Sequence, residues 1–142
     1  MSDPSPCSAP GAPGSRDTSS VQQRTVLLVD DDLIVREAVC QLIAYLGYEP
    51  LAAADGAAGL ELFRANRDRI GAVMLDVVMP GMSGEEVFRG LRRIDPNVRV
   101  LIVSGYPTEG ACTRLRDAGA RGFLAKPFQL QQLAAALDAV LK

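Results

Sequence analysis

The stretch Thr25-Val-Leu-Leu-Val-Asp-Asp-Asp32 decides how this 142-residue chain folds. Its first five residues form an apolar, β-branched run with the length of a buried strand, and three aspartates end that run. Apolar residues then recur at helical spacing: Ile34, Val35, Ala38, Leu42 and Leu46. Gly47 follows the last of them and is typical of a helix end. The stretch therefore predicts a buried strand followed directly by a helix.

The same strand-then-helix pattern occurs four more times along the chain. Further strands are predicted at about 49–53, 72–75, 98–103 and 121–125, and further helices at about 55–66, 83–94, 108–118 and 128–141. Asp55 is placed as an N-cap, and Ser83 with Glu86 fits a capping box. The last helix is expected to bury Leu130, Leu133, Leu137 and Val140.

Alternating strands and helices predict an α/β fold, a doubly wound parallel sheet with helices on both faces. Pro50 lacks a backbone N–H, so its strand belongs at the sheet edge. Right-handed crossovers then give the flavodoxin-like (βα)5 arrangement with strand order 2-1-3-4-5. Residues 25–142 are interpreted as this one domain. Residues 1–24, rich in Pro, Ser and Gly, are expected to form a disordered tail.

The amino-acid composition argues against several classes of function. The net charge of −2 argues against direct nucleic-acid binding. No apolar run approaches the roughly 20 residues that span a bilayer, and no secretory signal opens the chain. The cysteines, Cys7, Cys40 and Cys112, are scattered, which favours a reduced, cytoplasmic setting, and Cys40 and Cys112 are interpreted as small core or surface residues of predicted helices. Histidine is absent, which excludes every mechanism with a His base, nucleophile or metal ligand.

Polar residues end the predicted central strands. In chain order they are Asp30, Asp31 and Asp32, then Asp76, Ser104 and Lys126. The carboxyl ends of parallel strands meet at one edge of the sheet, where such folds bind ligands. Carboxylates about 4 Å apart repel by roughly 4 kcal/mol, so this site is expected to hold a hard divalent ion, Mg²⁺ or Mn²⁺. The ion and Lys126 would together neutralise phosphoryl oxygens. Asp32 alone could equally be a helix N-cap.

Four separated motifs resemble the receiver domain of two-component response regulators. They are Val26–Asp32, Leu75–Gly84, Val103–Tyr106 and Ala125–Phe128, and the resemblance covers about residues 24–142. The resemblance implies that Asp76 takes a phosphoryl group from a phosphohistidine of a sensor kinase or phosphotransfer protein. It implies further that Asp30, Asp31, Asp76 and the backbone carbonyl of Val78 hold Mg²⁺.

The same resemblance assigns roles to residues around the phosphoacceptor. Ser104 would be the switch hydroxyl, Phe123 the switch aromatic, and Lys126 the partner of a phosphoryl oxygen, with a cis bond to Pro127. Asp32 is expected to start the first helix rather than to bind metal. Val78 and Tyr106 would flank the mouth of the site, and their bulk predicts slow loss of the phosphoryl group.

The resemblance also implies partner surfaces. The face formed by residues 108–118, 121–125 and 128–141 is expected to change on phosphorylation and to contact a partner, with homodimerisation through it as an option. The Ser104-Gly-Tyr106 sequence is similar to receivers attached to, or serving, hybrid sensor kinases.

Two other classes of function compete with a signalling receiver that only phosphorylates and dephosphorylates itself. A small phosphohydrolase or phosphotransferase could use Asp76 as nucleophile, but such enzymes usually carry a second acid two residues on, where this chain has Val78. A non-phosphorylated interaction module usually lacks one of the acidic or Lys positions, and this chain keeps them all. The sequence has no Gly-x-Gly-x-x-Gly loop after the first strand and no Gly-x-x-x-x-Gly-Lys-Ser/Thr motif. These absences argue against a dinucleotide-binding site and against a phosphate-binding P-loop.

Overall fold

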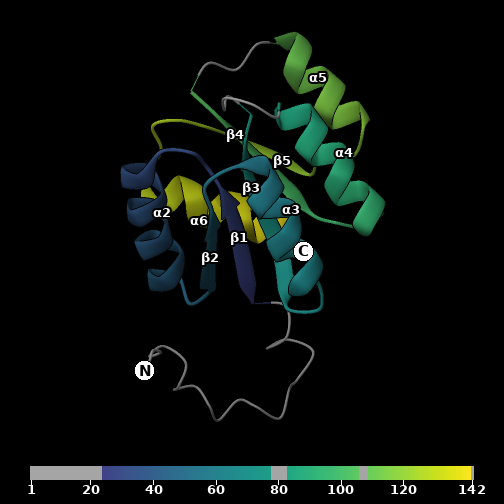
Figure 1. Cartoon of the computed structure of the whole chain (residues 1–142). Coiled ribbons are helices and arrows are strands. Elements are labelled where there is room, and N and C mark those ends of the chain that lie inside the picture. The colour runs from purple at the N-terminus through teal and green to yellow at the C-terminus, as the bar shows by residue number, and fades with distance from the viewer. Residues whose placement is uncertain (1–23, 78–82, 106–108, 142) are drawn as a thin grey trace.

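A computed structural model describes residues 24–77, 83–105 and 109–141, and Figure 1 shows the arrangement of its elements. Strands and helices alternate along the chain. The elements are β1 (Thr25–Val29), α2 (Leu33–Tyr45), β2 (Glu49–Ala53), α3 (Gly56–Ala65), β3 (Ile70–Asp76), α4 (Gly84–Ile94), β4 (Val100–Ser104), α5 (Glu109–Asp117), β5 (Gly122–Ala125) and α6 (Leu130–Leu141).

The strands form one parallel sheet with the predicted order β2-β1-β3-β4-β5. The strand with Pro50 lies at the edge, as its missing backbone N–H requires. Helices α2 and α6 cover one face of the sheet, and α3, α4 and α5 cover the other (Figure 1). The flavodoxin-like fold expected from the sequence is therefore confirmed.

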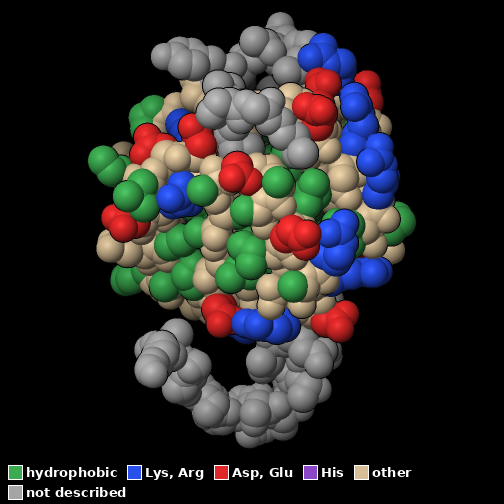
Figure 2. Space-filling view, viewed as in Figure 1, with side chains coloured by type: hydrophobic (Ala, Val, Ile, Leu, Met, Phe, Trp, Pro, Cys, Tyr) green, Lys and Arg blue, Asp and Glu red, His purple; other side chains and the backbone are tan. Residues whose placement is uncertain are grey.

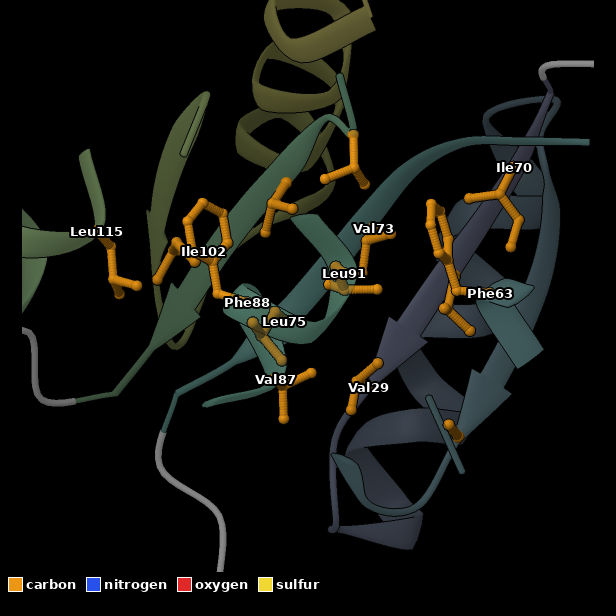
Figure 3. Close-up of a cluster of buried hydrophobic side chains, with 14 residues drawn as sticks. Val29, Phe63, Ile70, Val73, Leu75, Val87, Phe88, Leu91, Ile102 and Leu115 are labelled. Atoms are coloured by element: carbon orange, nitrogen blue, oxygen red, sulfur yellow. The ribbon is translucent and has the colours of Figure 1, made fainter. Parts of the chain in front are cut away.

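Each face of the sheet has its own hydrophobic core, because successive strand residues point to opposite faces. Leu27 and Val29 of β1 belong to the core under α3, α4 and α5, whereas Val26 and Leu28 belong to the core under α2 and α6. Figure 3 shows the first core, where Phe63 of α3 and Phe88 of α4 meet the strand side chains. All five residues of β1, and all of β3, are buried, which fixes these two strands at the centre of the molecule.

Local sequence signals set where the helices begin. The Asp32 carboxylate accepts from the backbone N–H groups of Ile34 and Val35, at 2.9 and 3.2 Å, and so starts α2 as predicted. Asp55 caps α3 in the same way. Ser83 and Glu86 form both hydrogen bonds of the capping box at the start of α4. These three expectations are confirmed.

Some boundaries differ from the sequence prediction. Strand β3 begins at Ile70 and β4 begins only at Val100. Val98 is buried ahead of β4, in a turn where its N–H donates to the carbonyl of Asp95. The prediction that Leu130 is buried is wrong: it is half-buried in the first turn of α6, which lies at the end of the sheet. Of the expected tail, residues 1–24, the first 23 lie outside the described ranges, whereas Arg24 is described and donates from its guanidinium to the Gly47 carbonyl at 2.7 Å.

No helix within the described ranges combines the length and the apolar composition that crossing a membrane requires.

Candidate functional site

The predicted site residues meet at the carboxyl edge of the sheet. Asp30 directly follows β1, Asp76 is the last residue of β3, and Ser104 is the last residue of β4. The register pairs Val29 with Leu75, so the two aspartates that come next lie side by side. Lys126 follows β5, and its backbone N–H donates to the Ser104 carbonyl at 2.9 Å. Four neighbouring strands thus bring these side chains together, as the sequence predicts.

Three carboxylates form the acidic part of the site. Asp30, Asp31 and Asp76 each offer an oxygen, and these oxygens lie within 4.8 Å of one another. Asp30 and Asp76 are only 1% and 5% exposed, whereas Asp31 faces solvent. Buried like charges at this separation repel strongly, which favours binding of a cation. The donor set fits a hard, hydrated divalent ion such as Mg²⁺, because every donor is a carboxylate oxygen and one side is open to water.

Lys126 supplies the positive charge inside this cluster. Its ammonium donates to Asp30 at 2.8 Å and to Asp76 at 3.0 Å. Burial alone would lower the pKa of Lys126, but hydrogen bonds and charge attraction from the two aspartates outweigh burial and raise that pKa. Lys126 therefore stays protonated at neutral pH and bridges the two buried carboxylates. Its peptide bond to Pro127 is cis, as expected.

Backbone contacts fix the orientation of Asp30. Its second carboxylate oxygen accepts from the N–H of Asp32 at 2.9 Å, while Arg36 donates to the Asp30 carbonyl at 2.9 Å. Arg36 lies on the first turns of α2 and was missed by the sequence analysis. The only available signal was its position one helical turn after the N-cap Asp32, from which a long side chain can reach back. Asp31 is left pointing outward, where an ion can approach from solvent.

The two predicted switch residues occupy different surroundings. Ser104 is buried, at 4% exposure, on the same edge as Asp76. Phe123 is half-buried in β5 and packs against the core under α3, α4 and α5, and the Arg116 guanidinium lies 5.0 Å from its ring centre. Val78 and Tyr106, predicted to flank the site, lie outside the described residues.

The cysteines take no part in this site as far as the described residues go. Cys40 is half-buried on α2, and burial raises the pKa of its thiol, an effect that the Arg36 charge partly offsets. The side chains of Cys7 and Cys112 fall outside the described residues.

Comparison with known proteins points to one family. The family described as response regulator receiver domain matches residues 26–138. Response regulator MprA of Mycobacterium sp. (strain KMS) is 38% identical over 117 residues, which cover 82% of this chain and 50% of that protein. Sensor kinase CckA of Brucella abortus is 36% identical over 118 residues, which cover 83% of this chain and 12% of that protein. The chain thus spans half, or less, of the length of these relatives.

Solved structures give the same likeness. The chemotaxis protein CheY4 of Vibrio cholerae superposes with a TM-score of 0.77 at 30% identity, covering 84% of this chain and 99% of that one. The CheX–CheY–BeF3–Mg²⁺ complex of Borrelia burgdorferi gives a TM-score of 0.74 at 27% identity, covering 82% and 86%. Both similarities extend over nearly the whole described part of the chain.

Proposed function

The chain belongs to the response regulator receiver family of two-component signalling, and from this premise we propose that Asp76 is its phosphoacceptor. One observation carries the proposal: Lys126 bridges Asp30 and Asp76, with Asp31 at the open side of the same cluster. Asp76 is the central carboxylate of this arrangement and sits at the end of a fully buried strand. A nucleophile needs this kind of fixed position to meet an incoming phosphorus atom.

Asp30, Asp31 and Asp76 are the residues that would hold Mg²⁺ or Mn²⁺, with the Val78 carbonyl as a further proposed ligand. Such an ion, when bound, neutralises charge on phosphoryl oxygens. The related CheX–CheY complex of Borrelia burgdorferi holds BeF3 and Mg²⁺, which supports this assignment by analogy. The carboxylate-only donor set of this chain agrees with it.

The phosphoryl transfer that we propose uses residues already in place. A carboxylate oxygen of Asp76 forms a bond to phosphorus while the bond from phosphorus to the donor's imidazole nitrogen breaks, and the imidazole leaves with that electron pair. Lys126 then exchanges its contact with Asp76 for one with a phosphoryl oxygen. Ser104, on the neighbouring strand, donates its hydroxyl to another phosphoryl oxygen. The repacking of Ser104 and Phe123 is the proposed switch.

We also propose partners, a responding surface and a cellular setting for this chain. We expect the donor to be a sensor histidine kinase or a histidine phosphotransfer protein, and the responding face to be α5, β5 and α6, including any homodimer contact. We expect slow phosphoryl loss because of Val78 and Tyr106, and a cytoplasmic setting. The chain is proposed to catalyse only its own phosphorylation and dephosphorylation.

Incubation with acetyl phosphate and Mg²⁺, followed by intact-mass spectrometry, tests this function. Wild type should gain one phosphoryl group, whereas Asp76→Asn should gain none and Asp55→Asn, at a remote helix cap, should behave as wild type. Continuous release of phosphate from excess donor would indicate a phosphohydrolase instead. Absence of any adduct on wild type would indicate a non-phosphorylated interaction module.

A further inference from the structure

A groove lies between the C-terminal half of α4 and the end of α5, away from the carboxylate cluster. Its volume is about 370 Å³, and it is lined by Phe88, Arg89, Arg92, Arg93, Pro96 and Ala118. These lining residues come from the end of α4, the turn after it and the turn after α5. Helix C-terminal ends in this fold lie toward the start of the strands, so the groove is at the opposite end of the domain from Asp76.

Arginines dominate the rim of this groove. Figure 2 shows Lys and Arg side chains in a column along one edge of the molecule, on the side where Figure 1 places α4. Arg89 has a long contact to Glu85, at 3.9 Å, and Glu85 is already held by Arg114 at 2.8 Å. Within the described ranges, no carboxylate lies within 4.0 Å of Arg92 or Arg93. The rim thus carries positive charge that this part of the molecule does not neutralise.

A preference for cations at helix ends accounts for only part of this pattern. The helix dipole favours arginines in the last turn of α4, where Arg92 and Arg93 lie. It does not account for Arg89 one turn earlier, on the same side of the helix as Arg93. Nor does it account for the apolar groove between these arginines and Ala118 on the neighbouring segment.

A buried aromatic ring and the turn after α5 shape this groove. Its floor includes Phe88, which is fully buried in the core, and its far wall includes the exposed Ala118. The Arg92 guanidinium lies against Gly119, whose φ of +117° and lack of a side chain make room for it, since a Cβ there would collide with Arg92. A buried apolar floor with charged walls suits a segment that presents carboxylates beside an apolar side chain.

We propose that this groove binds an acidic segment of a partner protein, whose carboxylates pair with Arg89, Arg92 and Arg93. Arg–carboxylate pairs provide directional, charge-assisted hydrogen bonds. Charge favours a short acidic segment over nucleic acid, because Glu85 and Glu86 precede the arginines on α4 and the chain as a whole carries a net charge of −2. A long polyanion that followed the helix would meet these carboxylates, whereas a short peptide would not.

Fluorescence anisotropy with a labelled peptide of paired Glu and Leu residues tests this proposal. Wild type should bind this peptide, and a peptide with Lys in place of Glu should not bind. The double variant Arg89→Gln/Arg93→Gln should weaken binding by roughly tenfold, because it removes two exposed charges without touching the packed Arg92. Arg64→Gln/Arg67→Gln, in the last turn of α3 and just after that helix, removes the same charge elsewhere and should change affinity by less than about twofold.

Several results would overturn the proposal. Wild type failing to bind the acidic peptide, equal weakening by both double variants, or displacement of the peptide by single-stranded DNA of equal charge would each do so. Phosphorylation of Asp76 by acetyl phosphate serves as the folding control for Arg89→Gln/Arg93→Gln, because the groove lies away from that site. If the double variant unfolds, the affinity of the single variant Arg93→Gln for the peptide is measured instead, with Arg67→Gln as its control.

Discussion

Lys126 is the residue on which the charge balance of the site depends. Its ammonium contacts both buried aspartates, and its side chain is itself only 23% exposed. Arg69 makes an ion pair of equal length, 2.8 Å to Glu49, but both of those side chains are about half exposed. The two pairs therefore separate the effect of burial from the effect of distance.

Replacing Lys126 by Met should lower the free energy of unfolding by roughly 2–4 kcal/mol in the presence of EDTA, because two buried carboxylates lose the cation that bridges them. Arg69→Met should cost less than about 1 kcal/mol, since water already screens that pair. Urea denaturation of both variants provides the comparison. Equal costs for the two substitutions would contradict the assignment of Lys126 as the charge that holds the cluster together.

At this scale, the sequence indicates the residues that end strands but not those that support them. Asp30, Asp76 and Ser104 could be placed because each ends an apolar run that marks a buried strand. Arg36 could not, because its contact with the Asp30 carbonyl depends on the angle at which α2 leaves the sheet. No local pattern encodes that angle.

At the scale of elements, the start of α4 packs directly against the residue that follows β3, the strand that ends in Asp76. A Cβ on Gly84, the first residue of α4, would lie 2.6 Å from the Cα of Val77, the residue after Asp76. Real Cβ atoms do not approach backbone so closely, so Gly84 allows the helix to begin against the end of β3. The helix and the site are thus coupled through a backbone contact.

Gly84→Ala should therefore displace either α4 or the segment that carries Asp76. We expect a loss of roughly 1–3 kcal/mol in the free energy of unfolding, as for other overpacked sites, together with slower phosphorylation by acetyl phosphate. Ser83→Ala is the matched control: it should cost about 1 kcal/mol by removing the capping box but leave phosphorylation unchanged. A Gly84→Ala protein that phosphorylates at the wild-type rate would show that the contact does not position Asp76.

The element boundaries show which features of the fold are determined by residues close together in the sequence. The caps Asp32, Asp55 and Ser83 were predictable because each contacts only residues up to three positions away. The start of β4 was not, because Val98 is as apolar as a strand residue and only the turn closed on Asp95 keeps it out of the sheet. Leu130 fits the helical pattern of α6, but it is the first residue of that helix and is only half-buried there.

At the scale of the whole molecule, the site joins segments that are far apart in the sequence. Its groups lie at the carboxyl ends of β1, β3 and β5, with a separation of 96 positions between Asp30 and Lys126 and of 50 between Asp76 and Lys126. Unfolding separates them, so an ion held by the three carboxylates binds the folded chain alone. Ion binding should then stabilise both cores on the two faces of the sheet, because β1 and β3 contribute to each.

Mg²⁺ at about a hundred times its dissociation constant should therefore raise the free energy of unfolding by about 2.7 kcal/mol, a shift in melting temperature on the order of 10 °C for a domain of this size. Differential scanning calorimetry in Mg²⁺ and in EDTA measures the shift. Asp31→Asn removes the exposed ligand and one like charge, so this variant should lose most of the shift yet melt in EDTA at no lower temperature than wild type. A full Mg²⁺ shift in Asp31→Asn would place the ion elsewhere. A lower melting temperature of Asp31→Asn in EDTA would show that Asp31 stabilises the fold by itself, contrary to the repulsion expected among the three carboxylates.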